Sequence, residues 1–299
     1  VDASEVLGSQ EVHDIAVAIG LCIRFFHPVA YVLCVMWVGA RQHALLVLMH
    51  EGSHFRMFRN RTLNDWVSDV LCGWPMFMTM HGYRREHVVH HHVPNTPEDP
   101  DWVRKLASPD WHFPKTAGQM ALMLGKDLLG LNLLQQLQRF TKANFNPAGK
   151  TKMTLSRTHK VTRLAFYSAL IAALTLNGWW VPFLMYWVVP FITWAKMTMR
   201  LRGIGDHFGL PLDHAYNMAR TVKNSWFDNL FVAPNHINYH LEHHLYPSVP
   251  FFRLPELHRT LMANSEYAAK AHVTSSYWGV IREVIAFRPK FEPQAEQAG

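Results

Sequence analysis

Residues 164 to 195 carry no charged side chain, and this run constrains the fold more than any other feature of the sequence. It is long enough for two passes through a bilayer, and Asn177-Gly178 near its centre is a typical turn sequence. Four tryptophans add the aromatic enrichment typical of membrane interfaces: Trp179, Trp180, Trp187 and Trp194. A buried helical hairpin of a large soluble enzyme is the alternative. We predict a transmembrane hairpin over about residues 164 to 198.

Basic residues flank this uncharged run at both ends. They are Lys150, Lys152, Arg157, Lys160 and Arg163 before it, and Lys196, Arg200 and Arg202 after it. Because basic residues near membrane ends mark the cytoplasmic side, the run is predicted to enter and leave on that side. The mostly apolar residues 13 to 49 predict a second hairpin, whose arms would be residues 13 to 27 and 28 to 49.

Eight histidines fall into three short clusters. The clusters are His50-Glu-Gly-Ser-His54, His87-Val-Val-His90-His91 and His240-Leu-Glu-His243-His244. Helix positions i, i+3 and i+4 project from one face, so each cluster offers two or three imidazoles pointing the same way. Imidazole suits Fe, Zn, Cu and Ni, and one metal takes about three or four such ligands. Eight histidines therefore favour two metals over one.

A shared site requires an even number of membrane crossings between clusters. Residues 66 to 80 separate the first two clusters, and this stretch is short, contains Asp69 and has Gly73-Trp74-Pro75 in its middle. We therefore interpret it as an interfacial or re-entrant segment rather than a span.

The fold class that follows is an all-α integral membrane protein with about four transmembrane helices in two hairpins. Residues 1 to 299 contain no linker or repeat, which predicts a single domain. Residues 50 to 163 and 199 to 299 would form a cytoplasmic helical cap that carries the histidine-rich dimetal site. The protein would be multi-pass, with its active site on the cytoplasmic side and its N-terminus cytoplasmic.

Two other metal chemistries deserve comparison with this interpretation. His50-Glu51-Gly52-Ser53-His54 matches the H-E-x-x-H signature of zinc proteases, in which the glutamate is the general base. That reading leaves the other two clusters unexplained. Carboxylate-bridged di-iron bundles need paired glutamates that this chain lacks, and its three cysteines form no CxxC pair.

The isolated histidines receive an ordinary interpretation as surface or hydrogen-bonded core residues. They are His13, His112, His159, His214, His258 and His272. His43 lies seven residues before His50, on nearly the same helix face, and either lines a substrate channel or makes a structural hydrogen bond.

Taken together, one H-x-x-x-H box and two H-x-x-H-H boxes with hydrophobic hairpins between them resemble the membrane fatty-acid desaturase and hydroxylase superfamily. The stretch from Asn238 through His240, His243 and His244 to Pro250, continuing to His258, looks very like the last box of acyl-lipid and acyl-CoA desaturases. So does the stretch from Arg84 to His91, with Asp99-Pro-Asp101 downstream. The resemblance spans roughly residues 28 to 260.

The resemblance implies a centre of two iron ions that activates O₂, and a ninth histidine ligand after the second hairpin. The matching position is His207, so the implied ligands are His50, His54, His87, His90, His91, His207, His240, His243 and His244. The sequence departs from the family in two places. The first box has three intervening residues where some acyl-CoA desaturases have four, and His92 extends the second box and leaves its register open by one step.

Metal-bound imidazoles need hydrogen-bond acceptors for their other ring nitrogens. The nearest carboxylates in sequence are Glu51, Glu86, Asp99, Asp101, Asp206 and Glu242. We expect this class of role from among them, with Glu51, Asp206 and Glu242 as candidates. Asn238, two residues before His240, is a candidate for orienting a metal-bound water.

Each turnover needs two electrons from outside, and the chain has neither a cysteine cluster nor a His-Pro-Gly-Gly haem element. A ferredoxin-, rubredoxin- or cytochrome-type donor with its reductase is therefore implied. The basic residues available for docking an acidic donor are Arg56, Arg59, Arg61, Arg84, Arg85, Lys150, Lys152 and Arg157. The net charge of +7 alone gives no support for binding to nucleic acid.

The function predicted is O₂-dependent desaturation of an acyl chain carried on a lipid, CoA or a carrier protein. Hydroxylation of an alkyl, carotenoid or other lipophilic substrate at the same site is the first alternative. A membrane zinc protease of the H-E-x-x-H type is a distant one.

Overall fold

The computed structural model describes residues 3–133, 138 and 156–288. The described chain is mostly helical, and its extended structure is a parallel pair of two-residue strands, β1 (Thr221–Val222) and β2 (Val273–Thr274). The all-α fold class predicted from the sequence is confirmed at this level. Of the basic residues considered for donor docking, Lys150 and Lys152 lie outside the described residues.

The N-terminal part is a helical hairpin of α1 (Ala3–Arg24) and α2 (Pro28–Ser53). The turn between them is short because Pro28 occupies the first turn of α2 and His27 caps it, its Nδ1 accepting the N–H of Val29 at 3.2 Å. The C-terminal half of α2 is almost wholly buried, whereas its first turns are largely exposed. This helix is the axis around which the other elements pack.

Residues 66 to 80 form an interrupted helical segment. Helix α3 (Arg61–Val67) passes into the π-helix η1 (Ser68–Gly73) and the 3₁₀ turn η2 (Trp74–Met76). Phe77 then adopts φ 59°, which reverses the chain before α4 (Met80–His92) begins at its cap Thr79. Pro75 lacks an N–H donor, and this explains the break at its position. The segment's place relative to a membrane stays a prediction.

The uncharged run forms a second hairpin, and its turn lies where the sequence predicted it. Helix α8 (Arg157–Leu176) ends at Asn177, Gly178 takes φ +65°, and a long helical run follows from Trp180 to His207. The run consists of α9 (Trp180–Phe183), the π-helices η4 (Leu184–Val188) and η5 (Phe191–Ala195), and α10 (Lys196–His207). Its π-segment packs on α2, and the side-chain amide of Gln42 donates to the carbonyl of Trp187 at 2.8 Å.

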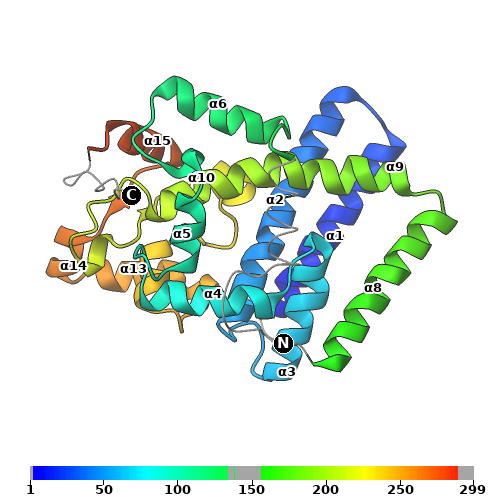
Figure 1. The fold of residues 1–299 in the computed structure, drawn as a ribbon, viewed down its shortest axis with the longest axis horizontal. Coiled ribbons are helices and arrows are strands. Elements are labelled where there is room, and N and C mark those ends of the chain that lie inside the picture. The colour runs from blue at the N-terminus through cyan, green and yellow to red at the C-terminus, as the bar shows by residue number, and fades with distance from the viewer. Residues whose placement is uncertain (1–2, 134–137, 139–155, 289–299) are drawn as a thin grey trace, which may run out of the picture.

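The remaining elements pack around α10 and the second half of α2, with α6 running alongside α10 (Figure 1). In the middle of the chain these are α5 (Pro100–Leu106), η3 (Pro109–Trp111) and α6 (Ala117–Leu128). After α10 come η6 (Ala215–Asn217), α11 (Trp226–Phe231), α12 (His240–Leu245), η7 (Phe251–Arg253), α13 (Leu254–Met262), α14 (Ser265–Lys270) and α15 (Tyr277–Ala286).

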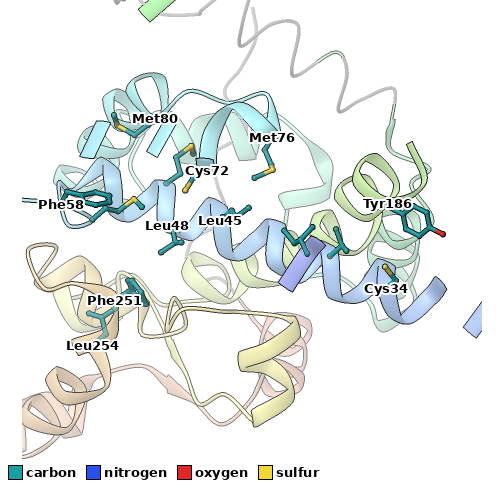
Figure 2. Packing of buried hydrophobic residues seen from close by; sticks show 14 of the residues in the cluster. Cys34, Leu45, Leu48, Phe58, Cys72, Met76, Met80, Tyr186, Phe251 and Leu254 are labelled. Atoms are coloured by element: carbon teal, nitrogen blue, oxygen red, sulfur yellow. The ribbon is translucent and has the colours of Figure 1, made fainter. Parts of the chain in front are cut away.

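The two larger hydrophobic clusters among the described residues hold this arrangement together. The first surrounds α2, where Leu45 and Leu48 pack with Cys72, Met76 and Met80 of the interrupted segment (Figure 2). The other residues of this cluster labelled in Figure 2 are Cys34, Phe58, Tyr186, Phe251 and Leu254. The second cluster joins α10 to α6 and α15 through Ile204, Met120 and Val280. The last turn of α10 and the last turns of α2 are thereby fixed from both sides.

One helix among the described residues, α2, is long and apolar enough by composition to cross a membrane. Exposed apolar side chains nevertheless gather at the turns of both hairpins, which lie on the same side of the molecule in Figure 1. At the first turn Phe25 is 65% exposed, and at the second Leu176 is 85% exposed. The four predicted crossings therefore remain a proposal, taken up below.

Candidate metal centre

All nine histidines named from the sequence lie together at the buried end of α2, and they form two groups. The five-histidine group consists of His50, His54, His87, His91 and His243. The four-histidine group consists of His90, His207, His240 and His244. Within each group the ring nitrogens lie within 4.8 Å of one another. Each group thus has the donor type, number and spacing that a transition metal requires.

In the five-histidine group, three elements supply the rings. His50 comes from the last turn of α2, and His54 is the residue that caps that helix. The Nε2 atom of His87 on α4 lies 2.9 Å from that of His54, and the Nε2 atom of His91 lies 3.0 Å from that of His87. His243 of α12 closes the group, with its Nε2 3.0 Å from that of His91.

The four-histidine group is assembled in the same way from α4, α10 and α12. His207, the last residue of α10, has its Nε2 3.1 Å from that of His90 and 2.9 Å from that of His240. The Nε2 atom of His244 lies 3.1 Å from that of His240. The ninth histidine, which the sequence supplied only through the family resemblance, is therefore at the centre of this group.

Each H-x-x-H-H cluster divides its rings between the two groups. On α4 the i and i+4 residues His87 and His91 enter the five-histidine group, while His90 enters the other. On α12 the division is reversed, since His240 and His244 pair and His243 faces the first group. The prediction that each trio points at one place was too simple, because i+3 and i+4 diverge by about 100° around the helix.

The two groups are direct neighbours. The rings of His91 and His244, one from each group, stack with their centroids 4.3 Å apart. His92 belongs to neither group, because its side chain is exposed and its Nδ1 donates to the carbonyl of Val88 at 2.7 Å. The register of the second cluster is therefore His87, His90 and His91, as preferred from the sequence.

Burial and the neighbouring imidazoles lower the pKa of several of these rings. Burial, together with the nearby imidazoles, lowers the pKa of His87, His240, His243 and His244 well below the ordinary value. For His91, burial and the neighbouring His54 and His90 lower the pKa to about 2. Only the neutral ring carries a free lone pair, so the site favours the form of histidine that binds metal.

The hydrogen bonds of two rings test whether the residues fit a metal. His90 donates through Nδ1 to Oδ2 of Asp99 at 2.7 Å, and His207 donates through Nδ1 to the carbonyl of Met218 at 3.1 Å. In the neutral ring both Nε2 atoms then carry lone pairs, yet they face each other at 3.1 Å. Two facing lone pairs repel, and a cation between them removes that repulsion. The residues therefore fit a metal bound through Nε2.

The carboxylates considered as orienting residues differ in whether they contact the nine histidines. Asp99 contacts His90 as described, and Asp206 lies 3.8 Å from Nε2 of His240 while pairing with Arg202 at 2.6 Å. Glu86 and Asp101 instead pair with Arg104.

The remaining candidates act mainly on neighbouring backbone and helices. Glu51 lies 3.6 Å from Nδ1 of His50, and its other oxygen accepts the N–H of Phe251 at 3.1 Å. Glu242 faces away from the two histidine groups and accepts from Tyr267 at 2.7 Å and from His258. Asn238 donates to the carbonyl of Val222 at 2.7 Å, and its buried Oδ1 has no protein partner among the described residues.

Several contacts of the site were missed from the sequence. The hydroxyl of Tyr83 lies 3.4 Å from Nδ1 of His87, and its ring stacks on that histidine. The Met218 carbonyl comes from a loop with no sequence signal of its own. Tyr83 is one helical turn before His87, a spacing that could have drawn attention to it. His43 is fully buried, with Nδ1 3.4 Å from the hydroxyl of Thr198, which supports its structural interpretation.

A cavity of about 450 Å³ opens beside the five-histidine group. Its wall includes His54 together with three of the arginines considered for donor docking, Arg56, Arg59 and Arg61. Arg84 is engaged elsewhere, since it binds Asp65 and the carbonyls of Gly52 and Ser53. Of the arginines considered for docking, those of the 56–61 segment therefore lie at the cavity beside His54.

Comparison with known proteins agrees with this geometry. The profile of a family described as "Fatty acid desaturase" matches residues 26–276, which is most of the chain. The match confirms the resemblance drawn from the three histidine clusters.

Curated relatives point the same way at low identity. The chain is 24% identical to a dihydrorhizobitoxine desaturase of Bradyrhizobium elkanii, over 87% of this chain and 73% of that protein. It is 23% identical to an sn-1 acyl-lipid omega-3 desaturase (ferredoxin) of Synechocystis, over 77% and 66%. It is 25% identical to a sphingolipid delta(4)-desaturase of Drosophila melanogaster, over 74% and 63%. The chain thus spans roughly two thirds of the length of these relatives.

Proposed function

This chain belongs to the fatty acid desaturase family and is an oxidoreductase, and we propose that it desaturates an acyl chain with O₂ at a centre of two iron ions. The observation that carries the proposal is the pair of adjoining histidine groups, five and four residues strong. When bound, the metals supply an oxidant for an unactivated C–H bond, which no side chain can provide.

The protein's own part is to hold and shield that centre. We propose that the five-histidine group and the four-histidine group each hold one iron through Nε2 atoms. Asp99 and the Met218 carbonyl fix the tautomers of His90 and His207, and Tyr83 does the same for His87. Asp206 and Glu51 adjust the charge beside His240 and His50. Asn238, with a free Oδ1, is proposed to orient a water near the four-histidine group.

The overall reaction fixes what must be supplied. Reduction of O₂ to two waters takes four electrons and four protons. Two of each come from the two C–H bonds that become a C=C bond, and two of each come from the donor and solvent. The substrate is proposed to be a lipophilic acyl chain on a lipid, CoA or carrier protein. The names of two relatives, an acyl-lipid desaturase and a sphingolipid desaturase, agree with a lipid substrate.

We propose that the two hairpins cross the membrane, giving four crossings, and that the nine histidines lie on the cytoplasmic side. The apolar side chains exposed at both hairpin turns support this topology, because water would otherwise contact them. The basic residues Arg157, Lys160 and Arg163 at the start of α8 also support it. The interrupted segment of residues 66 to 80 would lie at the interface.

The electron donor is proposed to be a small acidic carrier of the ferredoxin, rubredoxin or cytochrome type. Arg56, Arg59 and Arg61 line the cavity next to His54, so a carrier docked there lies beside a proposed iron ligand. The name of the Synechocystis relative includes ferredoxin, which is consistent with this class of donor.

Mass spectrometry of the product decides between the proposal and its alternative. The iron-loaded enzyme, a ferredoxin with its reductase and an acyl-lipid substrate should give a product about two mass units lighter than the substrate. A product about sixteen units heavier would show hydroxylation instead. Absence of any O₂-dependent product in the wild type, with two irons bound, would contradict both.

A further inference from the structure

A third cluster of metal-binding side chains lies away from the nine histidines. It consists of Asp69, His81 and His159, whose ligand atoms lie within 4.8 Å of one another. The three residues come from different elements, namely η1, α4 and α8. The proposed desaturase reaction makes no use of them, and the sequence alone predicts an ordinary surface or core role for His159.

The imidazole of His159 carries the strongest indication of a ligand. Its Nε2 lies 2.8 Å from Oδ2 of Asp69, but the direction of approach makes no hydrogen bond, so this nitrogen is buried without a partner. Two ligands of one metal show this geometry, because their lone pairs converge on the ion and not on each other. Around a tetrahedral zinc, ligands at about 2.1 Å lie about 3.4 Å apart, so the two atoms need to separate by about half an ångström to bind one.

The ring of His159 is also held firmly in place. It is 6% exposed, stacks on Trp66 with centroids 4.8 Å apart and meets the edge of Trp74. Asp69 is fully buried, and its other oxygen accepts the N–H of Met80 at 2.7 Å. Both ligand atoms are therefore fixed before any ion binds, which reduces the entropy lost on binding.

His81 completes the set from its more exposed side. Its Nδ1 lies 3.2 Å from Oδ2 of Asp69, and its Nε2 lies 3.3 Å from Oδ2 of Asp65. Asp65 is itself held by Arg84 at 2.6 Å. Without a metal the contact between Nδ1 and Asp69 is a hydrogen bond, which places the ring proton on Nδ1. Metal binding at Nδ1 would move that proton to Nε2, beside the Asp65 carboxylate. This carboxylate–histidine arrangement is common around protein-bound zinc.

We propose that Asp69, His81 and His159 form a mononuclear site for a divalent transition metal, with zinc as the favoured ion. Two imidazoles and one carboxylate suit zinc, which such ligands bind more tightly than iron(II). The side chain of His81, the third ligand, is 29% exposed, so an ion can enter from solvent and a water can complete the coordination. The ion ties the start of α8 to η1 and α4, independently of the two iron positions.

Zinc titration of the iron-loaded enzyme tests the proposal. The full chain with two irons is equilibrated with zinc and a competing chelator, and iron and zinc are both counted by mass spectrometry. We expect one zinc per chain in addition to the two irons. His159→Gln and His81→Asn should each weaken zinc binding about 100-fold or more, since even residues that only support a ligand contribute about 10- to 100-fold. His112→Gln and His214→Asn, at exposed positions elsewhere, should bind zinc as the wild type does.

A second measurement separates a metal site from a hydrogen-bonded histidine–aspartate network. Zinc should raise the thermal midpoint of the iron-loaded wild type and leave that of His81→Asn unchanged. X-ray absorption at the zinc edge should show two imidazoles and an oxygen ligand at about 2.0 to 2.2 Å. Two results would overturn the proposal: no zinc beyond the iron positions in the wild type, or equal zinc affinity in wild type and His159→Gln.

Discussion

Replacing Asp99 by Asn should weaken metal binding in the four-histidine group and leave the other group intact. Oδ1 of Asp99 caps α5 by accepting two backbone N–H groups, and Oδ2 accepts from Nδ1 of His90 at 2.7 Å and from the N–H of Asn95. Asparagine is a good cap, so its oxygen is expected to stay on α5 and its NH₂ to face His90. His90 must then accept at Nδ1 and carry its proton on Nε2, where the metal should bind.

The expected magnitude is that of losing an orienting carboxylate, about 10- to 100-fold in metal affinity, or roughly 1.4 to 2.7 kcal/mol. The assay is retention of iron against a graded chelator. Asp99→Asn should keep one iron at a chelator concentration where the wild type keeps two. Glu98→Gln makes the same chemical change at the exposed neighbouring position and should behave as the wild type. Equal retention of both irons in Asp99→Asn would refute the tautomer argument.

Three further predictions concern stability, pH and electron transfer. Gly52→Ala places a Cβ 1.9 Å from Oγ of Ser68, so chemical denaturation should show a loss of about 1 to 3 kcal/mol in the free energy of unfolding. Gly118→Ala, where the added Cβ meets open space, should show no such loss. An unaltered denaturation midpoint in Gly52→Ala would contradict the packing. Burial and nearby arginines lower the pKa of His54 from 6.5 to about 4. Between pH 4 and pH 6.5 the unfolded chain therefore binds more protons than the folded one. The free energy of unfolding of the metal-free protein should fall by about 1.4 kcal/mol per pH unit and per such imidazole as the pH falls from 6.5 toward 4. His54→Gln should flatten that slope, and an unchanged slope would count against it. Arg59→Glu should slow reduction by an acidic ferredoxin about tenfold at low salt and little at high salt, whereas a salt-independent rate would argue against docking there.

The histidine clusters were predictable because ligand type and helical spacing are local properties of the sequence. His50 and His54, or His240 and His244, share a helix face wherever the helix packs. His207 is different, since a single histidine at the end of α10 carries no local pattern and was found only through the family resemblance. The hairpin turn at Asn177-Gly178 was also local, because glycine readily adopts the positive φ that the turn needs.

Contacts that depend on tertiary packing were beyond the sequence. Glu242 lies within the third cluster, yet its face of α12 points to Tyr267 and His258 rather than to the other histidines. The Met218 carbonyl reaches His207 only because its loop folds back on α10. His159 contacts Asp69 although about 90 residues separate them in the sequence, and no spacing rule connects them.

The central claim is that the nine histidines hold two irons, one in each group. Crystals of the iron-loaded enzyme, measured on both sides of the iron absorption edge, test it directly through the anomalous difference map. We expect two iron peaks, one surrounded by His50, His54, His87, His91 and His243 and the other by His90, His207, His240 and His244. A single peak, or a zinc signal confined to His50 and His54, would contradict it.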